Sequence, residues 1–143
     1  MKSTKKFALV LAAMMILVAM ASAASAAEVT LRFAGQFPPD HTATGFMKEV
    51  AKEVAAKSNG RIDIKIFPAN QLGDYTLVYE ELIRGTIDMA LISVPSQFDP
   101  RMELVYINGF VTGYDGIKKA FKPNGWMAKK MDEFHTRLGV KFL

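Results

Sequence analysis

The sequence predicts an α/β fold in which an open, mostly parallel sheet carries helices on both faces. Segments with the two-residue period of strands alternate with segments of helical period, in the order strand, helix, strand, helix, strand. Each crossover between parallel strands is expected to be right-handed, which packs its helix back onto the sheet. The third strand is almost entirely apolar, as expected of an inner strand covered on both faces.

The first strand and helix follow from alternation and spacing. Residues 29–33 alternate apolar and polar side chains, which predicts a strand with one buried face. A turn-rich loop follows, and then apolar residues recur with the spacing of one helical face. They are Ala43, Phe46, Met47, Val50, Ala51, Val54 and Ala55. Asn59 and Gly60 supply a left-handed stop to this helix.

The second strand and helix lead to the third strand. Isoleucines at 62, 64 and 66 predict strand two, and Asp74 is a suitable cap for the helix that follows. Its apolar face is expected to contain Tyr75, Val78, Tyr79 and Leu82, and Gly85 marks its end. Residues 87–92 form the apolar third strand.

The strand order decides where a crevice opens. If strand one lies between strands two and three, the winding of the sheet reverses beside it, and a crevice forms outside the carboxyl ends of strands one and three. The loops Gly35–Thr42 and Ser93–Arg101 would line that crevice.

The remainder of the chain predicts two more helices. Asp115–Phe121 forms a short helix that ends at Pro123. A longer helix, stopped by Gly139, carries the apolar stripe Trp126, Met127, Met131, Phe134 and Leu138, with His135 expected to face solvent. Residues 140–143 resemble the start of another strand.

Residues 1–27 have the layout of a secretory signal peptide. Three lysines precede an apolar run that ends in a tract of alanine and serine, so cleavage is expected after Ala26 or Ala27. The alternative is an uncleaved membrane anchor, which the small residues of its last third disfavour. A lipoprotein anchor is excluded because the chain has no cysteine.

Composition narrows the function of residues 28–143. Fifteen basic and fourteen acidic residues lie in this part, a net charge of +1, and they form no basic stripe with interleaved aromatics. Nucleic acid is therefore not an expected partner. A cysteine-free exported chain of this size suits a bacterial periplasmic domain stabilised by its core.

The sequence shows no recognisable motif for catalysis, metal binding or cofactor binding. The two histidines, His41 and His135, have no ligand spacing to carboxylates, and the chain contains no nucleophile elbow or phosphate-binding loop. Glu80 is interpreted as an i,i+4 partner of Arg84 rather than as a catalytic carboxylate. We therefore expect neither an enzyme nor a metal or cofactor site.

A series of short motifs resembles the DctP-like extracytoplasmic solute receptors of TRAP transporters. The segments are Phe37–His41, Asn59–Pro68, Gln71–Asp74 and Gly85–Met89, and they occur in order along the chain. The most specific is the Gln-Leu-Gly turn, followed twelve residues after its glycine by Gly-x-Ile-Asp.

The resemblance implies a two-lobed periplasmic receptor that closes on a small carboxylate and delivers it to the membrane permease of a TRAP transporter. Residues 28–143 would form the N-terminal lobe, like one lobe of a periplasmic binding protein, and the start of the crossover to a missing second lobe. The arginine that pairs with the carboxylate in such receptors would lie beyond Leu143. We therefore expect the chain by itself to bind solute weakly.

The resemblance also implies which first-lobe residues contact solute. Gln36, Tyr75, Ser93 and Ser96 occupy positions similar to those that touch solute in the family, and each can form hydrogen bonds with oxygen. The aromatic rings of Phe37 and Phe98 are expected to wall the pocket. Arg101 is interpreted either as a residue that reaches the crevice or as a solvated loop charge.

Two alternative functions stay open at the level of sequence. A binding protein of an ATP-driven importer would also bind its ligand in a crevice at the strand ends, but it would be expected to carry different motifs. An exported enzyme of flavodoxin-like shape is disfavoured because nucleophile and phosphate-loop motifs are absent.

The first prediction concerns export. Expressed in a bacterium with a periplasm, the chain should be cleaved after Ala26 or Ala27, because the basic start, apolar run and small-residue tract match signal peptidase requirements. N-terminal sequencing of the periplasmic fraction tests this. Recovery of intact Met1 in the membrane fraction would contradict it.

Overall fold

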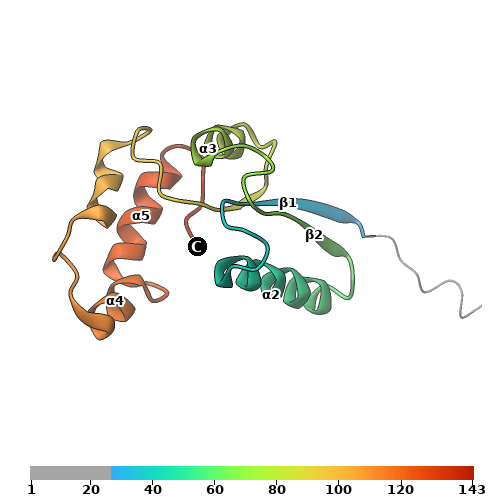
Figure 1. Cartoon of the computed structure of the whole chain (residues 1–143), viewed down its shortest axis with the longest axis horizontal. Coiled ribbons are helices and arrows are strands. Elements are labelled where there is room, and N and C mark those ends of the chain that lie inside the picture. The colour runs from blue at the N-terminus through green and yellow to red at the C-terminus, as the bar shows by residue number, and fades with distance from the viewer. Residues whose placement is uncertain (1–26) are drawn as a thin grey trace, which may run out of the picture.

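The computed structural model describes residues 27–143, so the predicted signal peptide lies almost wholly outside the described residues. The elements in chain order are β1 (Val29–Gly35), α2 (Thr42–Lys57), β2 (Ile62–Phe67), α3 (Tyr75–Arg84), β3 (Met89–Leu91), the 3₁₀ helix η1 (Pro100–Tyr106), α4 (Gly113–Phe121) and α5 (Trp126–Thr136). Figure 1 shows a sheet flanked by α2 and α3, beside a group of helices formed by the C-terminal third of the chain.

The predicted strand order is confirmed. The sheet has the order β2-β1-β3, and β1 is parallel to both neighbours. Phe33 of β1 is opposite Ile66 of β2 and Met89 of β3, which fixes the register of the sheet. Because β1 lies in the middle, the chain winds outward from it in both directions, as a crevice at its carboxyl end requires.

Helices cover both faces of the sheet, also as predicted. On one face, Phe33 packs with Met47 of α2 and Ile64 of β2. On the other face, the adjacent Ala34 packs with Val78 of α3 and with Ile87. The two-residue period of β1 therefore separates two layers of core.

The predicted caps set the ends of α3. The Asp74 carboxylate accepts hydrogen bonds from the backbone N–H groups of Thr76 (3.0 Å) and Leu77 (2.9 Å). At the other end Gly85 adopts a left-handed conformation with φ of 73°. Capping satisfies backbone groups that have no partner within the helix.

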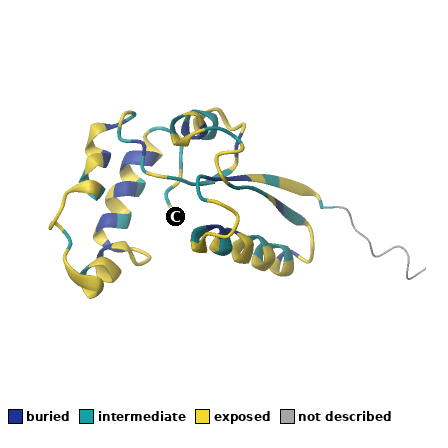
Figure 2. Cartoon of the chain, in the orientation of Figure 1, coloured by how far each residue is buried: buried dark blue, intermediate teal, exposed yellow. Residues whose placement is uncertain are grey.

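The apolar stripe of α2 is only partly buried, which corrects the prediction. Phe46 and Val50 are exposed, and the contact with the sheet narrows to Met47, Ala51 and Val54. Figure 2 shows the exposed outer side of this helix. The side of α2 that carries Phe46 and Val50 therefore does not pack against the sheet.

The third strand is shorter and less central than predicted. Only residues Met89–Leu91 pair with β1, and within the described residues β3 lies at an edge of the sheet. Ile87 is buried, but it precedes the strand and packs beneath α3. The apolar run therefore reflects contact with a helix as well as a place in the sheet.

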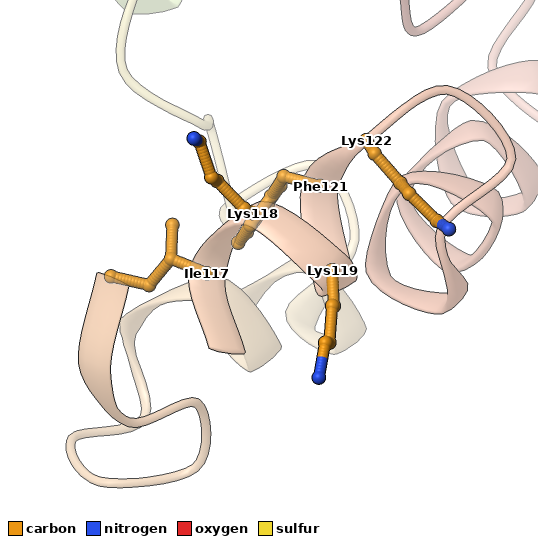
Figure 3. Close-up of a pocket in the computed structure, with 5 residues that line it drawn as sticks. All are labelled: Ile117, Lys118, Lys119, Phe121 and Lys122. Carbon is orange, nitrogen blue, oxygen red and sulfur yellow. The ribbon is translucent and has the colours of Figure 1, made fainter. Parts of the chain in front are cut away.

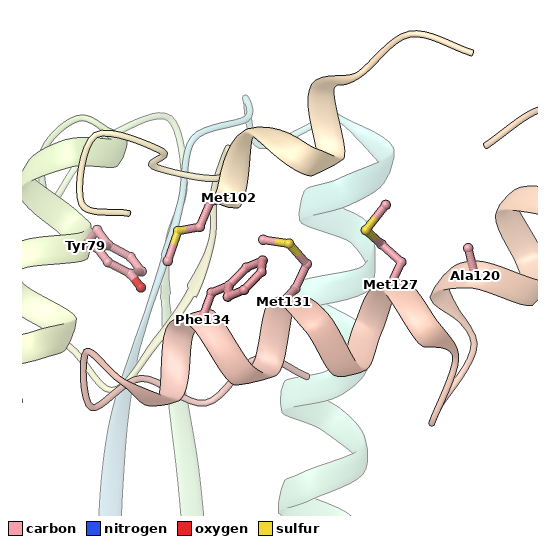
Figure 4. Close-up of a cluster of buried hydrophobic side chains, with 6 residues drawn as sticks. All are labelled: Tyr79, Met102, Ala120, Met127, Met131 and Phe134. Atoms are coloured by element: carbon pink, nitrogen blue, oxygen red, sulfur yellow. The ribbon is translucent and has the colours of Figure 1, made fainter. Parts of the chain in front are cut away.

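A second layer, formed by η1, α4 and α5, packs against α3. Its core is the set of buried side chains in Figure 4, namely Tyr79, Met102, Ala120, Met127, Met131 and Phe134. The helix η1 was not predicted, although Asp99 as cap and Pro100 at its first position are a recognisable start signal. Trp126, expected in the buried stripe, is instead 46% exposed.

Two further predictions for the C-terminal segment are wrong. Residues 140–143 do not form a strand, and Phe142 packs against the helical core and stacks on the His135 ring. His135 does not face solvent, since only 5% of it is exposed. Its ring fills the space between α5, α3 and the C-terminal segment, an arrangement that helical spacing within α5 does not reveal.

Among residues 27–143, none of the helices is both long and apolar enough to cross a membrane.

Two glycines provide a stability test. A Cβ at Gly125, in the turn between α4 and α5, would lie 2.2 Å from the carbonyl oxygen of Ala120, whereas a Cβ at Gly45 in α2 meets nothing within 4 Å. Gly125→Ala should destabilise the fold by about 1–3 kcal/mol through overpacking against backbone. Gly45→Ala should stabilise it by roughly 0.5–1 kcal/mol because alanine is the better helix former. Urea unfolding measures both, and equal effects would contradict the tight α4–α5 turn.

Candidate functional site

A pair of hydrogen bonds joins the ends of β1 and β3. The Gln36 side-chain amide donates from Nε2 to the Ser93 Oγ (3.0 Å) and accepts at Oε1 from the Ser93 backbone N–H (2.7 Å). Gln36 thus uses both ends of its amide on one residue. We call this pair the Gln36–Ser93 clasp.

The sheet places the clasp. Gly35 is paired with Leu91 in the parallel ladder, and the Gln36 N–H donates to the Leu91 carbonyl oxygen (3.4 Å). The segments that follow β1 and β3 leave the sheet at the same edge, so the side chains of Gln36 and Ser93 meet there. The strand order predicts a crevice at this edge of the sheet, and the Gln36–Ser93 pair lies there.

The loop between β2 and α3 forms another side of this region. The sequence singled out its Gln-Leu-Gly turn as a family motif but not as part of the site. Its backbone N–H groups at Ala69 and Asn70 donate to the carbonyl oxygens of Phe37 (2.8 Å) and Gly35 (3.0 Å). Both residues adopt left-handed backbone, with φ of 54° and 57°. Such conformations are costly for residues other than glycine, and the surrounding hydrogen bonds hold them here. Asn70, which precedes the Gln-Leu-Gly turn, was the feature of the sequence that could have indicated this conformation, because asparagine adopts left-handed backbone more readily than most residues.

The loop after β3 is tied to the start of α3. The Gln97 Nε2 donates to the Thr76 Oγ1 (2.6 Å), beside Tyr75 at the first position of the helix. Tyr75 is 40% exposed, so part of its side chain is accessible to solvent. The loop after β3 therefore links the end of that strand to the first turn of α3.

The remaining sequence-predicted residues make other contacts. Phe37 stacks on His41 with ring centroids 4.3 Å apart, and His41 caps α2 by accepting from the Ala43 N–H (3.1 Å). The Ser96 hydroxyl donates to Glu103 of η1. Phe98 packs on Tyr79 at 4.9 Å, at the edge of the helical core. The structure thus brings Gln36 and Ser93 into contact and directs Ser96 and Phe98 toward the helical layer.

Arg101 is held by an acidic neighbour. Its Nε lies 2.9 Å from the Asp99 Oδ1, and its guanidinium lies over the Phe134 ring at 4.9 Å. The hydrogen bonds and charge of Arg101 lower the pKa of Asp99 to about 2, so the carboxylate stays ionised. Because the pair is mutually neutralising, Arg101 brings no unbalanced charge to the crevice.

Two cavities lie away from the crevice. One of about 510 Å³ is lined by residues 117–122 of α4 and its C-cap, and Figure 3 shows its Ile117 and Phe121 with lysines around them. The other, about 360 Å³, lies between η1 and α4. A hollow lined by a single short helical segment offers few converging polar groups, so the crevice is the better candidate site. The described residues contain no cluster of three or more potential metal ligands of the His, Cys, Asp or Glu type.

The fold and the polar strand ends define a class: an α/β protein whose loops gather at the carboxyl ends of a parallel sheet, where such folds bind ligands. The family model described as bacterial extracellular solute-binding protein, family 7 (DctP) matches residues 33–143. The chain belongs to this family.

Solved structures of TRAP periplasmic solute-binding proteins share the fold. The protein from Ochrobactrum anthropi is 21% identical, with a TM-score of 0.71 over 79% of this chain and 35% of its own length. The Haemophilus influenzae protein, with bound L-gulonate, is 20% identical, with a TM-score of 0.68 over 79% of this chain and 37% of its own.

A sugar-acid-binding protein from Advenella mimigardefordensis, in complex with galactonate, is 16% identical, with a TM-score of 0.72 over 80% of this chain and 37% of its own. The chain therefore spans a little over a third of the length of the structures it matches.

The clasp predicts an order of stability effects. Gln36→Ala removes both hydrogen bonds and should cost about 1–2 kcal/mol, whereas Ser93→Ala removes only the side-chain bond and should cost roughly 0.5–1 kcal/mol. In a double-mutant cycle the two changes should be non-additive. Gln36→Ala combined with Ser96→Ala is the control and should be additive to about 0.5 kcal/mol, because Ser96 bonds elsewhere. Equal costs for the first two variants would contradict the clasp.

Proposed function

We propose that this chain is one lobe of a periplasmic receptor that binds a small organic acid and delivers it to a TRAP-type secondary transporter. The observation that carries the proposal is the Gln36–Ser93 clasp at the carboxyl ends of β1 and β3. It lies in a chain of a solute-binding family, at the place where open parallel sheets bind ligands.

The chemistry of the clasp suits an oxygen-rich solute. A glutamine amide has two donors and an acceptor, and a serine hydroxyl both donates and accepts, so the pair can bond carboxylate oxygens as well as hydroxyls. The exposed Tyr75 phenol adds another such group at the start of α3. The bonds within the clasp hold these groups in place before solute arrives.

Three solved structures of similar fold support the substrate class. They hold L-gulonate, galactonate and, in a protein from Polaromonas, D-erythronate. These molecules share a carboxylate followed by several hydroxyls. We propose a polyhydroxy acid of this kind as the solute here.

The proposal also covers where in the cell the protein acts and how it acts. Export through a cleaved signal peptide would put the lobe in the periplasm, where it would meet the permease, and it would act as a binding protein without catalysing a reaction. A second lobe would close over the solute and supply its charge partner. One wall alone leaves the solute largely hydrated, which weakens every polar contact.

A titration followed by amide NMR tests the proposal. Galactonate should shift the amide signals of Gln36, Ser93, Val94, Ser96 and Gln97, with a dissociation constant weaker than about 1 μM because one wall of the site is present. Gln36→Ala and Ser93→Ala should each weaken binding about fivefold or more.

The controls separate this site from the cavity on α4. Galactose, which has hydroxyls but no carboxylate, serves as the uncharged comparison, and Ile117→Ala alters the α4 cavity while leaving the clasp intact. Shifts centred on residues 117–122, or no saturable shifts with any sugar acid, would sink the proposal. Micromolar or tighter binding would show instead that a single lobe is a sufficient receptor.

A further inference from the structure

A buried hydrogen bond joins the sheet layer to the helical layer. The Tyr79 hydroxyl of α3 and the Nδ1 of His135 on α5 are 2.6 Å apart. Tyr79 is 2% exposed and His135 is 5% exposed. The Nε2 of His135 is also buried, and it has no hydrogen-bond partner among the described residues.

The same two rings support the loop after β3 and the end of the chain. Tyr79 lies against Phe98 of that loop, with ring centroids 4.9 Å apart, and edge-on to His135. On its other side His135 stacks on Phe142. Tyr79 thus stands between α5 and the loop that carries Ser93.

We propose that the Tyr79–His135 hydrogen bond is a pH-sensitive latch that holds the loop of residues 93–99, and with it the Ser93 side of the crevice, in place. In this role Tyr79 and His135 are positioning residues, since neither touches the crevice itself. The latch does not depend on solute, whereas its effect on solute affinity rests on the proposed function.

Neutral histidine suits the site and protonated histidine does not. In the tautomer with Nδ1 unprotonated, Nδ1 accepts a hydrogen bond from the Tyr79 hydroxyl. Protonation makes Nδ1 a donor toward the phenol oxygen, so the phenol O–H loses its acceptor, and it places a charge in a buried site. Burial raises the pKa of Tyr79 to about 12, with the charge of Asp99 adding to the effect, so the phenol keeps its proton throughout. Unpaired buried donors and an uncompensated buried charge both favour opening.

The charged groups around the His135 ring do not reverse the preference of the buried site for neutral histidine. Burial lowers the pKa of His135 below its ordinary 6.5, while Asp132 on its own helix and Asp99 at the start of η1 act in the opposite direction. Each carboxylate is already paired, Asp99 with Arg101 and Asp132 with Lys141. From α3 the group that faces the ring is the uncharged Tyr79 phenol.

The sign of the pH dependence follows. The opened state exposes a histidine of ordinary pKa, so it binds more protons than the closed state once the pH falls below about 6.5. The latch is therefore at full strength above that pH and weakens as the pH falls through the lower pKa of the closed state. Within that window the open population rises by up to about tenfold per pH unit.

Hydrogen exchange on the chain without solute tests the latch. The Ser96 and Phe98 amides donate to the carbonyl oxygens of Val94 (3.1 Å) and Pro95 (3.2 Å), so their protection reports the closure of the loop. Between about pH 7.5 and about pH 5, their protection, corrected for intrinsic exchange, should fall at least about threefold. Amides of β1 paired with β2 should not change in this way.

Three variants separate the latch from a general loss of stability. His135→Asn keeps an amide near the position of Nδ1 but cannot titrate, so the acid step should disappear. His41→Asn retains a good cap for α2 and should keep the acid step. Tyr79→Phe should lower the protection of both loop amides already at neutral pH. An acid step that survives His135→Asn, or loop protection unaffected by Tyr79→Phe, would overturn the latch.

A measurement on the unaltered chain covers the case in which the variants do not fold. The NMR titration of the His135 ring should have the same midpoint as the shifts of the Ser96 and Phe98 amides, whereas a match to His41 would overturn the proposal. Galactonate titrations at the two pH values then extend the test. Affinity that does not change with pH refutes the coupling to solute, while absence of binding at both pH values refutes the proposed function and leaves the exchange result standing.

Discussion

The position of β1 in the middle of the sheet is the constraint on which the rest of the structure depends. Its alternation buries Phe33 against α2 and Ala34 against α3, so one short strand organises two layers of core. Because both neighbours are parallel to it, the strand ends gather at one edge. The Gln36–Ser93 clasp is a direct consequence of that topology.

The helical layer is attached through α3. Tyr79 has its ring in the core of η1, α4 and α5 and its hydroxyl on His135, while the neighbouring Val78 faces the sheet. One helix therefore belongs to both layers, and it also begins beside the crevice at Tyr75. In the proposed latch, a change in the helical layer would reach the loop after β3 through the packed side chains of His135, Tyr79 and Phe98.

The site itself is polar and open, which agrees with one wall of a two-walled receptor. Gln36 and Ser93 satisfy each other, and Arg101 is satisfied by Asp99. Such groups can exchange partners when solute arrives, and they gain strength only when water is excluded from around them. A second wall is therefore central to the proposed function, in keeping with the greater length of the similar structures.

The sequence alone determined what depends on neighbours along the chain. Alternation placed β1 and β2, the caps Asp74 and Gly85 set the ends of α3, and the parallel winding located the crevice loops. These features depend on backbone geometry and on side-chain periods of two and 3.6 residues, and such periods are visible in the order of the amino acids.

The tertiary structure decided what depends on residues far apart in the chain. The burial of His135 arises because Tyr79 and Phe142 meet around it, and Phe46 is exposed because its side of α2 does not pack against the sheet. The clasp partner of Gln36 is 57 residues away. The spacing of residues along the chain does not reveal such contacts, because burial depends on which surfaces meet after folding. Local sequence therefore determines helices, strands and caps, whereas tertiary packing determines which side chains are buried or paired.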